Sequence, residues 1–303
     1  MGASAKSALA AVDALPPPHP IRRRVAPEPP VVPPIAAKEA KARAKPFVKW
    51  VGGKRSILKT LVVAAPKNYA HYHEPFAGGG ALFFELQPSP ASLSDINPHL
   101  MTAYRAVRDT IDALVKALQR HARAHCKDHY LHARACLSRE GDPTARAALL
   151  IYLNKTGYNG LYRVNRAGHY NVPMGDYTSP SILDEENLRR ASQALQGVQI
   201  HTRSFSQIEP AKGDFFYLDP PYYKTYDQYS HDRFDAQAHE DLAKFCRRID
   251  SKGGAFMLSN SDTDFVRRLY KGFGIREVMA ARHVSCKAGQ RGAHRELLIR
   301  NYD

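Results

Sequence analysis

The sequence predicts an α/β protein with a mostly parallel β-sheet, helices on both faces, and a helical insert between the early and late strands. Short apolar runs that are typical of strands alternate with longer runs of helical periodicity along most of the chain. At 303 residues the chain can bury the core of one large domain with an insertion. No apolar run approaches the roughly 18 residues that a membrane-spanning helix needs.

The first 45 residues are predicted to be a disordered basic tail rich in Ala and Pro. Prolines alternate with alanines and with the run Arg22-Arg23-Arg24, without apolar periodicity. Such a segment cannot bury enough apolar surface to offset the entropy lost on ordering. A secretory pattern is not expected either, because Lys6 and Asp13 interrupt the Ala-rich opening.

Regular elements are expected from Pro46 onward, separated by Gly and Pro turns. A Gly52-Gly53 turn leads into the first helix, and the first strand candidate lies around Tyr72 and His73. The other elements expected in the first half are helices over 56–65, 81–86 and 145–153, a strand over 91–93, and a mostly polar helical stretch over 99–137.

The second half continues the alternation of strands and helices. Residues 156–177 are rich in Gly, Asn, Tyr and Arg and are predicted to be a loop. We expect one domain from residues 46–98 and 181–303, which carry the sheet, and a smaller one from residues 99–180. The strands expected here lie over 198–202, 215–218, 255–259 and 296–300, and the helices over 185–195, 236–251 and 263–269.

Charge points to a polyanionic partner. Lys and Arg number 44 against 29 acidic residues, which gives a formal net charge of +15. Residues 1–45 carry eight basic and three acidic side chains, so the rest of the chain keeps a net charge of +10. A folded body this basic favours nucleic acid over a membrane as the partner, since no basic amphipathic anchor is evident. A charge that serves only solubility is the alternative.

The cysteines and histidines do not predict a metal site. Three histidines, His121, His125 and His129, could share one helix face with Cys126. No tight ligand pair accompanies them, so we interpret these residues as exposed helix histidines near nucleic acid. The widely spaced cysteines also argue against a disulfide framework and favour a reducing cytoplasm. The four cysteines are Cys126, Cys136, Cys246 and Cys286.

The strongest single motif is Asp219-Pro220-Pro221-Tyr222, directly after the strand candidate over 215–218. Ligands of open α/β sheets lie beyond the carboxyl ends of strands, where this motif falls. Its prolines fix φ and remove two backbone donors, which leaves a stiff loop that presents carbonyl oxygens. The Asp219 carboxylate and the Pro220 carbonyl could accept from the exocyclic amine of a base, and Tyr222 could stack on that base. A rigid turn without function is the alternative.

A Gly-rich corner follows the first strand candidate, from Glu74 to Gly80. Glycines between a strand and a helix let the backbone approach a ligand closely. Asp95, at the end of the next strand, is well placed to accept from ribose hydroxyls. The corner does not match a phosphate loop, so it predicts an adenosine derivative such as S-adenosylmethionine; simple packing is the alternative.

Two further segments could contact a ligand or nucleic acid. The single Trp of the chain, Trp50, lies in the segment KWVGGK between Lys49 and Lys54, where a buried Trp beside solvated lysines is the alternative. In the loop, interleaved basic and aromatic residues could hold phosphates, stack on bases and read guanine edges. A merely exposed Tyr-rich loop is the alternative here. The loop residues in question are Lys155, Tyr158, Tyr162, Arg163, Arg166, His169, Tyr170 and Tyr177.

Taken in order, these motifs resemble the Dam-like (D12 class) adenine-N6 DNA methyltransferases. The motifs are KWVGGK, EPFAGGG, SDIN, NKTGYNGLYRVNRAGHYNVPMG, DPPY and RELLIRNY, and the match runs from about Pro46 to Asp303. The resemblance implies a Rossmann-like methyltransferase domain that uses S-adenosylmethionine, with a helical target-recognition insert. It also implies a cytoplasmic, monomeric enzyme that acts on double-stranded DNA and requires neither a metal nor a membrane.

The resemblance also assigns roles to matching residues of the catalytic domain. Ser204-Phe205 stands where the family often has Asp-Phe, which leaves Phe205 to pack on the adenine ring of the cofactor. Catalysis would rest on the loop Asp219, Pro220, Pro221 and Tyr222. Cofactor contacts are implied for Trp50, Lys54, Glu74, Phe76, Gly78, Asp95, Phe205 and Asp219.

For DNA, the resemblance makes GATC the expected target. In the GATC-methylating members, the lysine before the motif's Trp contacts the first guanine, which here is Lys49. Tyr158 and Asn159 match residues that invade the duplex near the flipped base, and Tyr177 is also expected to contact DNA. The residues that match those discriminating the later bases are Leu161, Arg163 and Pro173.

The expected reaction is base flipping followed by direct methyl transfer. The target adenine would leave the duplex and enter a pocket beside Tyr222. Asp219 and Pro220 would orient its N6 toward the methyl donor, without a covalent enzyme intermediate. The alternatives are cytosine-N4 methylation, RNA adenine methylation, and a catalytically silent DNA-binding protein with the same fold.

Overall fold

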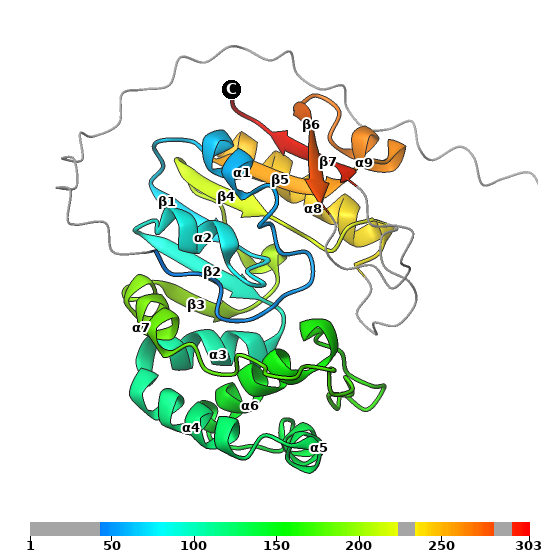
Figure 1. Cartoon of the computed structure of the whole chain (residues 1–303). Coiled ribbons are helices and arrows are strands. Elements are labelled where there is room, and N and C mark those ends of the chain that lie inside the picture. The colour runs from blue at the N-terminus through cyan, green and yellow to red at the C-terminus, as the bar shows by residue number, and fades with distance from the viewer. Residues whose placement is uncertain (1–42, 224–233, 282–292) are drawn as a thin grey trace, which may run out of the picture. The chain divides into compact units, whose positions relative to one another are not determined.

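The computed structural model describes residues 43–223, 234–281 and 293–303, which form a seven-stranded sheet surrounded by helices (Figure 1). The strand order is β3-β2-β1-β4-β5-β7-β6. The strands from β3 to β5 pair in parallel, whereas β7 pairs antiparallel with β5 and β6. The predicted mostly parallel sheet is therefore confirmed. The strands are β1 (His71–Glu74), β2 (Ala91–Asp95), β3 (Gln199–Thr202), β4 (Asp214–Leu218), β5 (Ala255–Ser261), β6 (Gly274–Ala281) and β7 (Ala293–Arg300).

Strand β6 was not predicted from the sequence. It lies at the edge of the sheet, where Val278 and Ala280 are buried while Arg276, Glu277 and Met279 are exposed. Charged side chains of this kind are common on edge strands and weaken the apolar pattern by which a strand is recognised. The backbone pairing with β7 makes this segment a strand.

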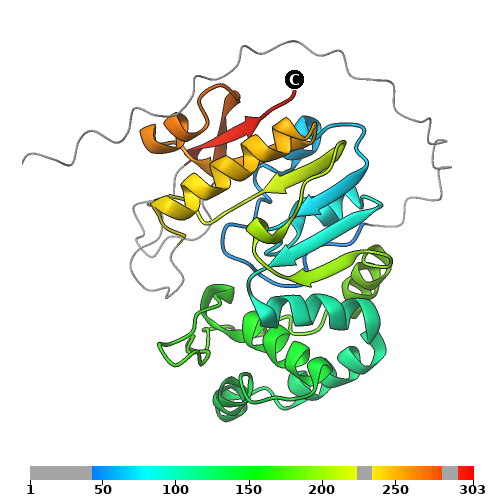
Figure 2. The ribbon, with the colours of Figure 1, turned by 180° about the vertical axis from the view of Figure 1, so that it is seen from behind.

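Helices cover both faces of the sheet, as predicted. Helices α1 and α2 lie on the face toward the viewer in Figure 1, and α8 lies on the opposite face, which Figure 2 brings to the front. Between them β4 is buried along its whole length. Phe215 and Tyr217 join one hydrophobic cluster, and Phe216 and Leu218 join a second one that includes α8. The helices are α1 (Leu58–Ala64), α2 (Ala81–Leu86), α8 (Ala236–Ser251) and α9 (Asp264–Leu269).

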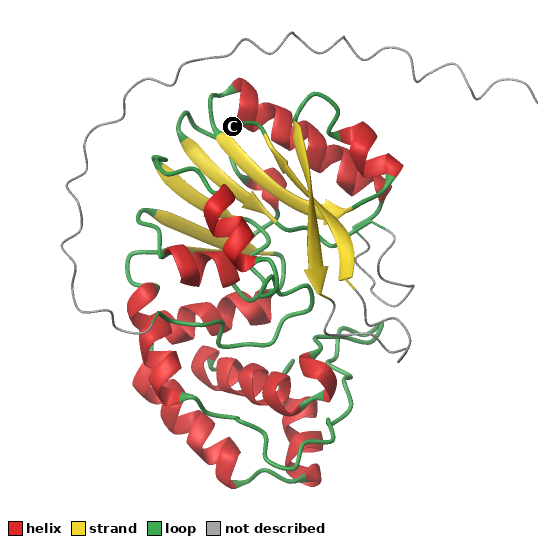
Figure 3. Cartoon of the chain, turned by 45° about the horizontal axis from the view of Figure 1, so that its top comes forward, coloured by secondary structure: helices red, strands yellow, loops and turns green. Residues whose placement is uncertain are grey.

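A helical insert connects β2 to β3 and packs on the β3 edge of the sheet (Figure 3). The expected polar helical stretch over 99–137 consists of three helices, with breaks at Thr110 and at residues 124–126. Helix α3 is amphipathic, and its buried face packs on α6. The elements of the insert are α3 (Pro98–Asp109), α4 (Ile111–Arg123), α5 (Lys127–Cys136), α6 (Pro143–Thr156) and η1 (Tyr158–Gly160), and α7 (Glu185–Ala194) follows them before β3.

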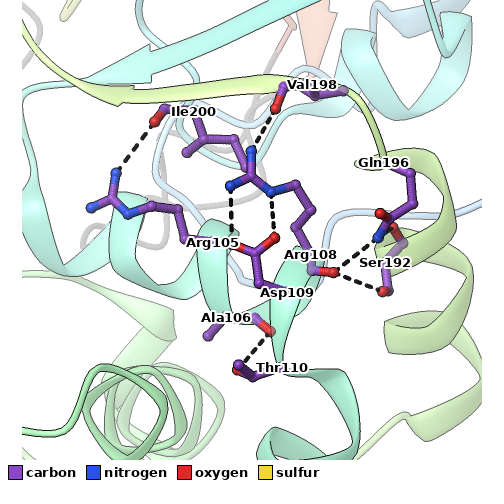
Figure 4. Close-up of polar contacts among 9 residues, drawn as sticks. All are labelled: Arg105, Ala106, Arg108, Asp109, Thr110, Ser192, Gln196, Val198 and Ile200. Atoms are coloured by element: carbon purple, nitrogen blue, oxygen red, sulfur yellow. Dashed lines mark hydrogen bonds and ion pairs between the residues drawn. The ribbon is translucent and has the colours of Figure 1, made fainter.

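Two arginines of α3 fasten the insert to the edge of the sheet (Figure 4). Arg108 Nη1 donates to the Val198 carbonyl at 2.6 Å, and Arg105 Nη1 donates to the Ile200 carbonyl at 3.4 Å. Gln196, which follows α7, donates to the Arg108 carbonyl at 2.9 Å. Because β3 is an edge strand, these arginines occupy carbonyls that would otherwise face an open edge.

The fold begins before the predicted end of the tail at residue 45. Arg43 forms an ion pair with Glu85 at 2.8 Å. The Lys45 backbone N–H donates to Asn187 Oδ1 at 2.8 Å, and its carbonyl accepts from Asn187 Nδ2 at 2.9 Å. This part of the predicted tail is therefore held by the body of the protein, and the remainder lies outside the described residues. Within the described ranges, no helix is long and apolar enough to cross a membrane.

Candidate active site

The loop that follows β4 carries a buried ion pair. Asp219 directly follows the last residue of β4, at the carboxyl edge of the sheet. The Lys54 ammonium lies 2.8 Å from Asp219 Oδ1 and also donates to the Gly52 carbonyl at 2.6 Å. Lys54 is only 6% exposed, so the charge of each partner depends on the other. The structure thus brings together two residues that the sequence analysis named from separate motifs.

Tyr222 is held on two sides. The Lys54 ammonium lies 4.8 Å from the centroid of the Tyr222 ring, a cation–π distance. The Tyr222 hydroxyl donates to Glu296 Oε2 on β7 at 2.8 Å. A phenol that donates to a carboxylate makes a charge-assisted hydrogen bond, which is stronger than a neutral one. The ring of Tyr222 is therefore restrained at its face and at its tip.

The end of β5 fixes the backbone of the same loop. Asn260 Oδ1 accepts from the Tyr223 N–H at 3.4 Å, and the Ser261 hydroxyl donates to the Tyr223 carbonyl at 3.0 Å. The Tyr223 ring lies against Phe265 at 4.3 Å between centroids. The predicted loop is thus anchored through side chains and backbone together, which suits a site that must be organised before its ligand binds.

Burial changes the protonation of the acids at this edge. Burial raises the pKa of Glu74 to about 8, and the Asp219 carboxylate contributes to the shift, although a hydrogen bond from Tyr72 at 2.6 Å opposes it. Burial also raises the pKa of Asp219, although the nearby Lys54 ammonium opposes that shift. Carboxyl groups with raised pKa values bind protons more tightly than exposed acids, as is common at active sites.

The Gly-rich corner between β1 and α2 provides a backbone cradle. Gly78 has a φ of +46°, and a Cβ there would lie 2.9 Å from the Trp50 ring. Its N–H donates to Asp95 Oδ2 at 3.2 Å, and the other Asp95 oxygen accepts from the Asn97 N–H at 2.9 Å. Trp50 is half-buried and stacks on Tyr162 with 5.8 Å between centroids. Glycine is needed where the corner meets Trp50, because a larger residue has no room.

Aromatic rings line the next part of this edge. The Phe76 ring lies 5.6 Å from the Phe205 ring and 5.7 Å from the Phe234 ring, between centroids. Ser204 begins the short helix η2 (Phe205–Gln207), and its side chain accepts from the Ser206 N–H. Serine at this position therefore caps a turn that presents Phe205, which is 8% exposed, to the aromatic cluster.

The side chains at this edge fit an adenosine-type cofactor that carries positive charge. The side-chain oxygens of Glu74, Asp95 and Asp219 can accept from ammonium and hydroxyl groups, and Phe76 and Phe205 offer rings against which a purine can pack. The glycine corner brings backbone close to Asp95. Three acids at one edge disfavour a phosphate-bearing nucleotide, whereas S-adenosylmethionine carries an ammonium group and a positively charged sulfur.

A separate group of predicted residues surrounds one buried amide. Asn154, 2% exposed, accepts from the Lys49 N–H at 2.7 Å and donates to the Lys49 carbonyl at 2.7 Å and the Gly160 carbonyl at 2.9 Å. A Cβ at Gly160 would lie 2.5 Å from the Lys49 Cβ. The Lys49 ammonium lies 4.5 Å from the Tyr177 ring centroid. Lys49, η1 and Tyr177 are therefore held together as one exposed surface.

The residues of this loop divide into exposed and inward-facing sets. Tyr158 is 45% exposed, and the exposed Asn159 has a φ of +53°. Arg163 is exposed but donates to Asn171 Oδ1 at 2.8 Å. Leu161 is half-buried. The remaining residues with predicted DNA contacts are the exposed Pro173 and the half-buried Tyr177.

The expected alternation of basic and aromatic side chains does not hold throughout this loop. Tyr170 is buried, and its hydroxyl donates to the Leu161 carbonyl at 3.0 Å. Tyr162 packs on Trp50, as described above. Lys155 is half-buried in the last turn of α6. These three side chains support the fold, because the loop needs its own apolar interior once it leaves the helices.

His121, His125 and His129 form a half-buried cluster at the junction of α4 and α5, whereas His132 is exposed. The rings of His121 and His129 lie 5.0 Å and 5.2 Å from the Tyr152 ring, and His125 Nδ1 lies 2.9 Å from the Tyr152 hydroxyl. Burial lowers the pKa of His121 to about 4. The interpretation of exposed histidines was therefore wrong for these three side chains, which are half-buried around Tyr152, but it holds for His132. Among the described residues, no group of three or more His, Cys, Asp or Glu side chains could hold a metal ion.

Three polar residues of the site escaped the sequence analysis. Glu296 lay within the quoted segment RELLIRNY, and Asn154 opened the quoted loop, but neither was given a role. Asn260 was not singled out at all. The available signal was weak: each residue stands beside other polar residues at one end of an apolar run, a position that does not indicate a buried partner.

Comparison with known proteins gives a consistent family. The family model described as D12 class N6 adenine-specific DNA methyltransferase matches residues 50–284. Type II methyltransferase M1.LlaDCHI of Lactococcus lactis subsp. cremoris is 37% identical over 276 residues, which cover 86% of this chain and 97% of that protein. Type II methyltransferase M.MjaIII of Methanocaldococcus jannaschii is 40% identical over 287 residues, with coverages of 85% and 99%. The DNA adenine methylase of Escherichia coli K12 is 30% identical over 261 residues, with coverages of 83% and 93%.

Proposed function

We propose how this chain, which belongs to the D12 class of N6 adenine-specific DNA methyltransferases, reaches and modifies its target. It flips an adenine out of double-stranded DNA, within the sequence GATC, and methylates N6 with S-adenosylmethionine as donor. The observation that carries this proposal is the loop of Asp219 and Tyr222, with its ion pair to Lys54 at the carboxyl edge of the sheet. A base inside a duplex cannot reach such a buried group, so it must leave the stack.

The residues of the loop act on the target nitrogen. When bound, S-adenosylmethionine supplies a methyl group on positively charged sulfur. Asp219 and the Pro220 carbonyl accept hydrogens of the adenine N6, which holds the nitrogen in place and increases its electron density. As N6 gains its bond to carbon it must lose a proton, and Asp219, with a pKa raised by burial, is a suitable acceptor. Pro221 keeps the loop stiff, and Tyr222 stacks on the base.

Cofactor binding falls to the residues around the glycine corner. Glu74 and Asp95 accept from polar groups of the cofactor, and Lys54 balances the charge of Asp219 through their ion pair. Phe76 and Phe205 enclose the adenine ring. Trp50 closes the corner against Gly78. These roles agree with the chemistry of the side chains and with the burial of the acids.

Target recognition falls to the exposed surface around Lys49. A lysine can donate to the O6 and N7 acceptors of guanine, as the first base of GATC would require. Leu161, Arg163 and Pro173 read the later bases, with Arg163 reaching DNA after exchanging its contact with Asn171. Tyr158 and Asn159 enter the duplex beside the flipped adenine, and Tyr177, on the same loop, contacts DNA. In this scheme residues 46–98 and 181–303 form the catalytic domain, and residues 99–180 form the target-recognition domain.

The test is methyl transfer from labelled S-adenosylmethionine to DNA duplexes. One duplex carries GATC, a second carries the same bases scrambled, and the products are separated as nucleosides. N6-methyladenine confined to the GATC duplex is the expected result. Label in N6-methyladenine at another sequence would overturn the recognition roles of Lys49, Leu161, Arg163 and Pro173. Label in cytosine, or label in RNA alone, would overturn the assignment of the base or of the nucleic acid.

A further inference from the structure

The last strand of the sheet in the sequence, β7, brings a carboxylate to the loop of Asp219 and Tyr222. We call this carboxyl edge of the parallel strands, where the loop lies, the catalytic edge. Glu296 lies on β7 opposite Ser261, the last residue of β5. Strand β7 runs antiparallel to β5, so a residue near its beginning lies at the edge where β4 and β5 end. Glu296 accepts the Tyr222 hydroxyl hydrogen bond across 74 residues of sequence.

We propose that Glu296 is a positioning residue for the target adenine, holding the Tyr222 ring in the orientation in which it stacks on the flipped base. The inference rests on the proposed function, because it takes Tyr222 to be the ring that meets that base. Glu296 itself touches neither the base nor the methyl donor. It acts only through the phenol of Tyr222.

The backbone of the loop does not depend on this hydrogen bond. Asn260 and Ser261 hold the N–H and the carbonyl of Tyr223, and Lys54 holds Asp219 at the other end of the loop. Removal of the Glu296 carboxylate therefore leaves the loop where it is. What it releases is rotation of the Tyr222 ring about its side-chain bonds.

That rotation matters because stacking requires a defined plane. A tyrosine ring has several staggered orientations about its first side-chain bond, and its second is broad. The Lys54 ammonium restrains the ring only from its face, at 4.8 Å from the centroid. The hydrogen bond to Glu296 at 2.8 Å fixes the opposite end of the side chain, the phenol tip. The two contacts together leave one plane for the base to meet.

The charge of Glu296 is a second effect that can be separated from the hydrogen bond. The carboxylate also helps to raise the pKa of Asp219. Tyr222→Phe removes the hydrogen bond and keeps the charge. Glu296→Gln removes the charge and keeps an acceptor oxygen, so a positioning role predicts that this variant stays close to wild type.

The experiment uses the full chain with a duplex that wild type methylates, prepared once with adenine and once with 2-aminopurine at the target position. Fluorescence of 2-aminopurine reports unstacking, and single-turnover methylation reports transfer. For Glu296→Ala we expect roughly tenfold slower transfer, the loss of one hydrogen bond to a charged group, and a smaller fluorescence change. Binding of S-adenosylmethionine should be unchanged.

Two further variants and one control complete the design. Tyr222→Phe should slow transfer as much as Glu296→Ala, and the double variant should be no slower than either one. Glu277→Ala is the matched control, since Glu277 lies on the neighbouring strand β6 and pairs with Arg267. This control should keep the wild-type rate and fluorescence change.

The outcomes separate this inference from the function on which it rests. If the wild-type enzyme causes no fluorescence change in the 2-aminopurine duplex, base flipping is overturned, and the role of Glu296 with it. If wild type flips the base and Glu296→Ala does the same at an unchanged rate, only the role of Glu296 is overturned. Additive losses in the double variant, or weaker cofactor binding equal to the loss of rate, would also overturn it.

Discussion

The catalytic edge and the recognition surface, which is formed by Lys49, η1 and Tyr177, use polar side chains in opposite ways. At the catalytic edge the charges themselves are buried: Lys54 is 6% exposed and pairs with Asp219 at 2.8 Å. At the recognition surface the buried polar group is the amide of Asn154, and the side chain of Lys49 remains exposed. Charge buried near a reaction acts strongly and without reorganisation, whereas a side chain that reads DNA must be accessible and needs only a fixed backbone.

The largest effect should come from the catalytic edge. In Asp219→Ala the target nitrogen loses its acceptor and Lys54 loses its partner, so methyl transfer should fall by roughly 1,000-fold. DNA binding should be largely retained, because the recognition surface is separately anchored. Single-turnover transfer and DNA-binding assays check both, with the exposed Asp241→Ala on α8 as the control. A variant that methylates at the normal rate would remove Asp219 from the mechanism.

Asn154→Ala tests whether this buried amide supports the backbone of the recognition surface. It leaves the Lys49 and Gly160 backbone groups without their partner and should lower the free energy of unfolding by about 2–3 kcal/mol. Asn187→Ala is the matched control, because Asn187 holds the Lys45 backbone in the same two-bond manner. Denaturant unfolding should show similar losses for the two variants. Only Asn154→Ala should reduce discrimination between GATC and altered sites. An equal loss of discrimination in both variants would refute a specific role of Asn154 in recognition.

The pH dependence of stability tests the burial of the catalytic acids. The pKa of Glu74 is raised from 4.5 to about 8 in the folded protein. Between these values the folded state keeps a proton that the unfolded state has lost, so the free energy of unfolding should decrease as pH rises through this window. The decrease should continue across this window and should flatten above the folded pKa. Glu74→Gln should reduce the slope; an unchanged slope would show that other groups cause it.

The smallest effect is expected for an exposed side chain of the recognition surface. Lys49→Ala should weaken discrimination at the first base of GATC by roughly tenfold, because one contact to a base edge is lost. Lys59→Ala, an exposed lysine on α1, is the control for loss of charge alone. Competition between duplexes that differ at this base measures the ratio. Equal weakening on all sequences would make Lys49 a phosphate contact.

Local pattern alone located most of the fold and the main motifs. Helix α8 begins and ends at the predicted residues, and the Asp219 to Tyr222 loop follows a predicted strand. Both are encoded by short-range periodicity and by Gly and Pro, which act on the backbone next to them. Strand β6 was missed because its conformation depends on pairing with β7, which leaves no comparable local pattern.

The partners of the catalytic loop were decided only by the tertiary structure. Lys54 and Asp219 come from motifs far apart in the sequence, and Tyr222 meets Glu296 across the sheet. In the same way, Tyr170 turns inward while Tyr158, on the same loop, turns outward. A loop has no periodicity from which the direction of a side chain follows. The sequence by itself therefore determined which residue types stand at each corner, and the packing of distant elements determined which of them meet.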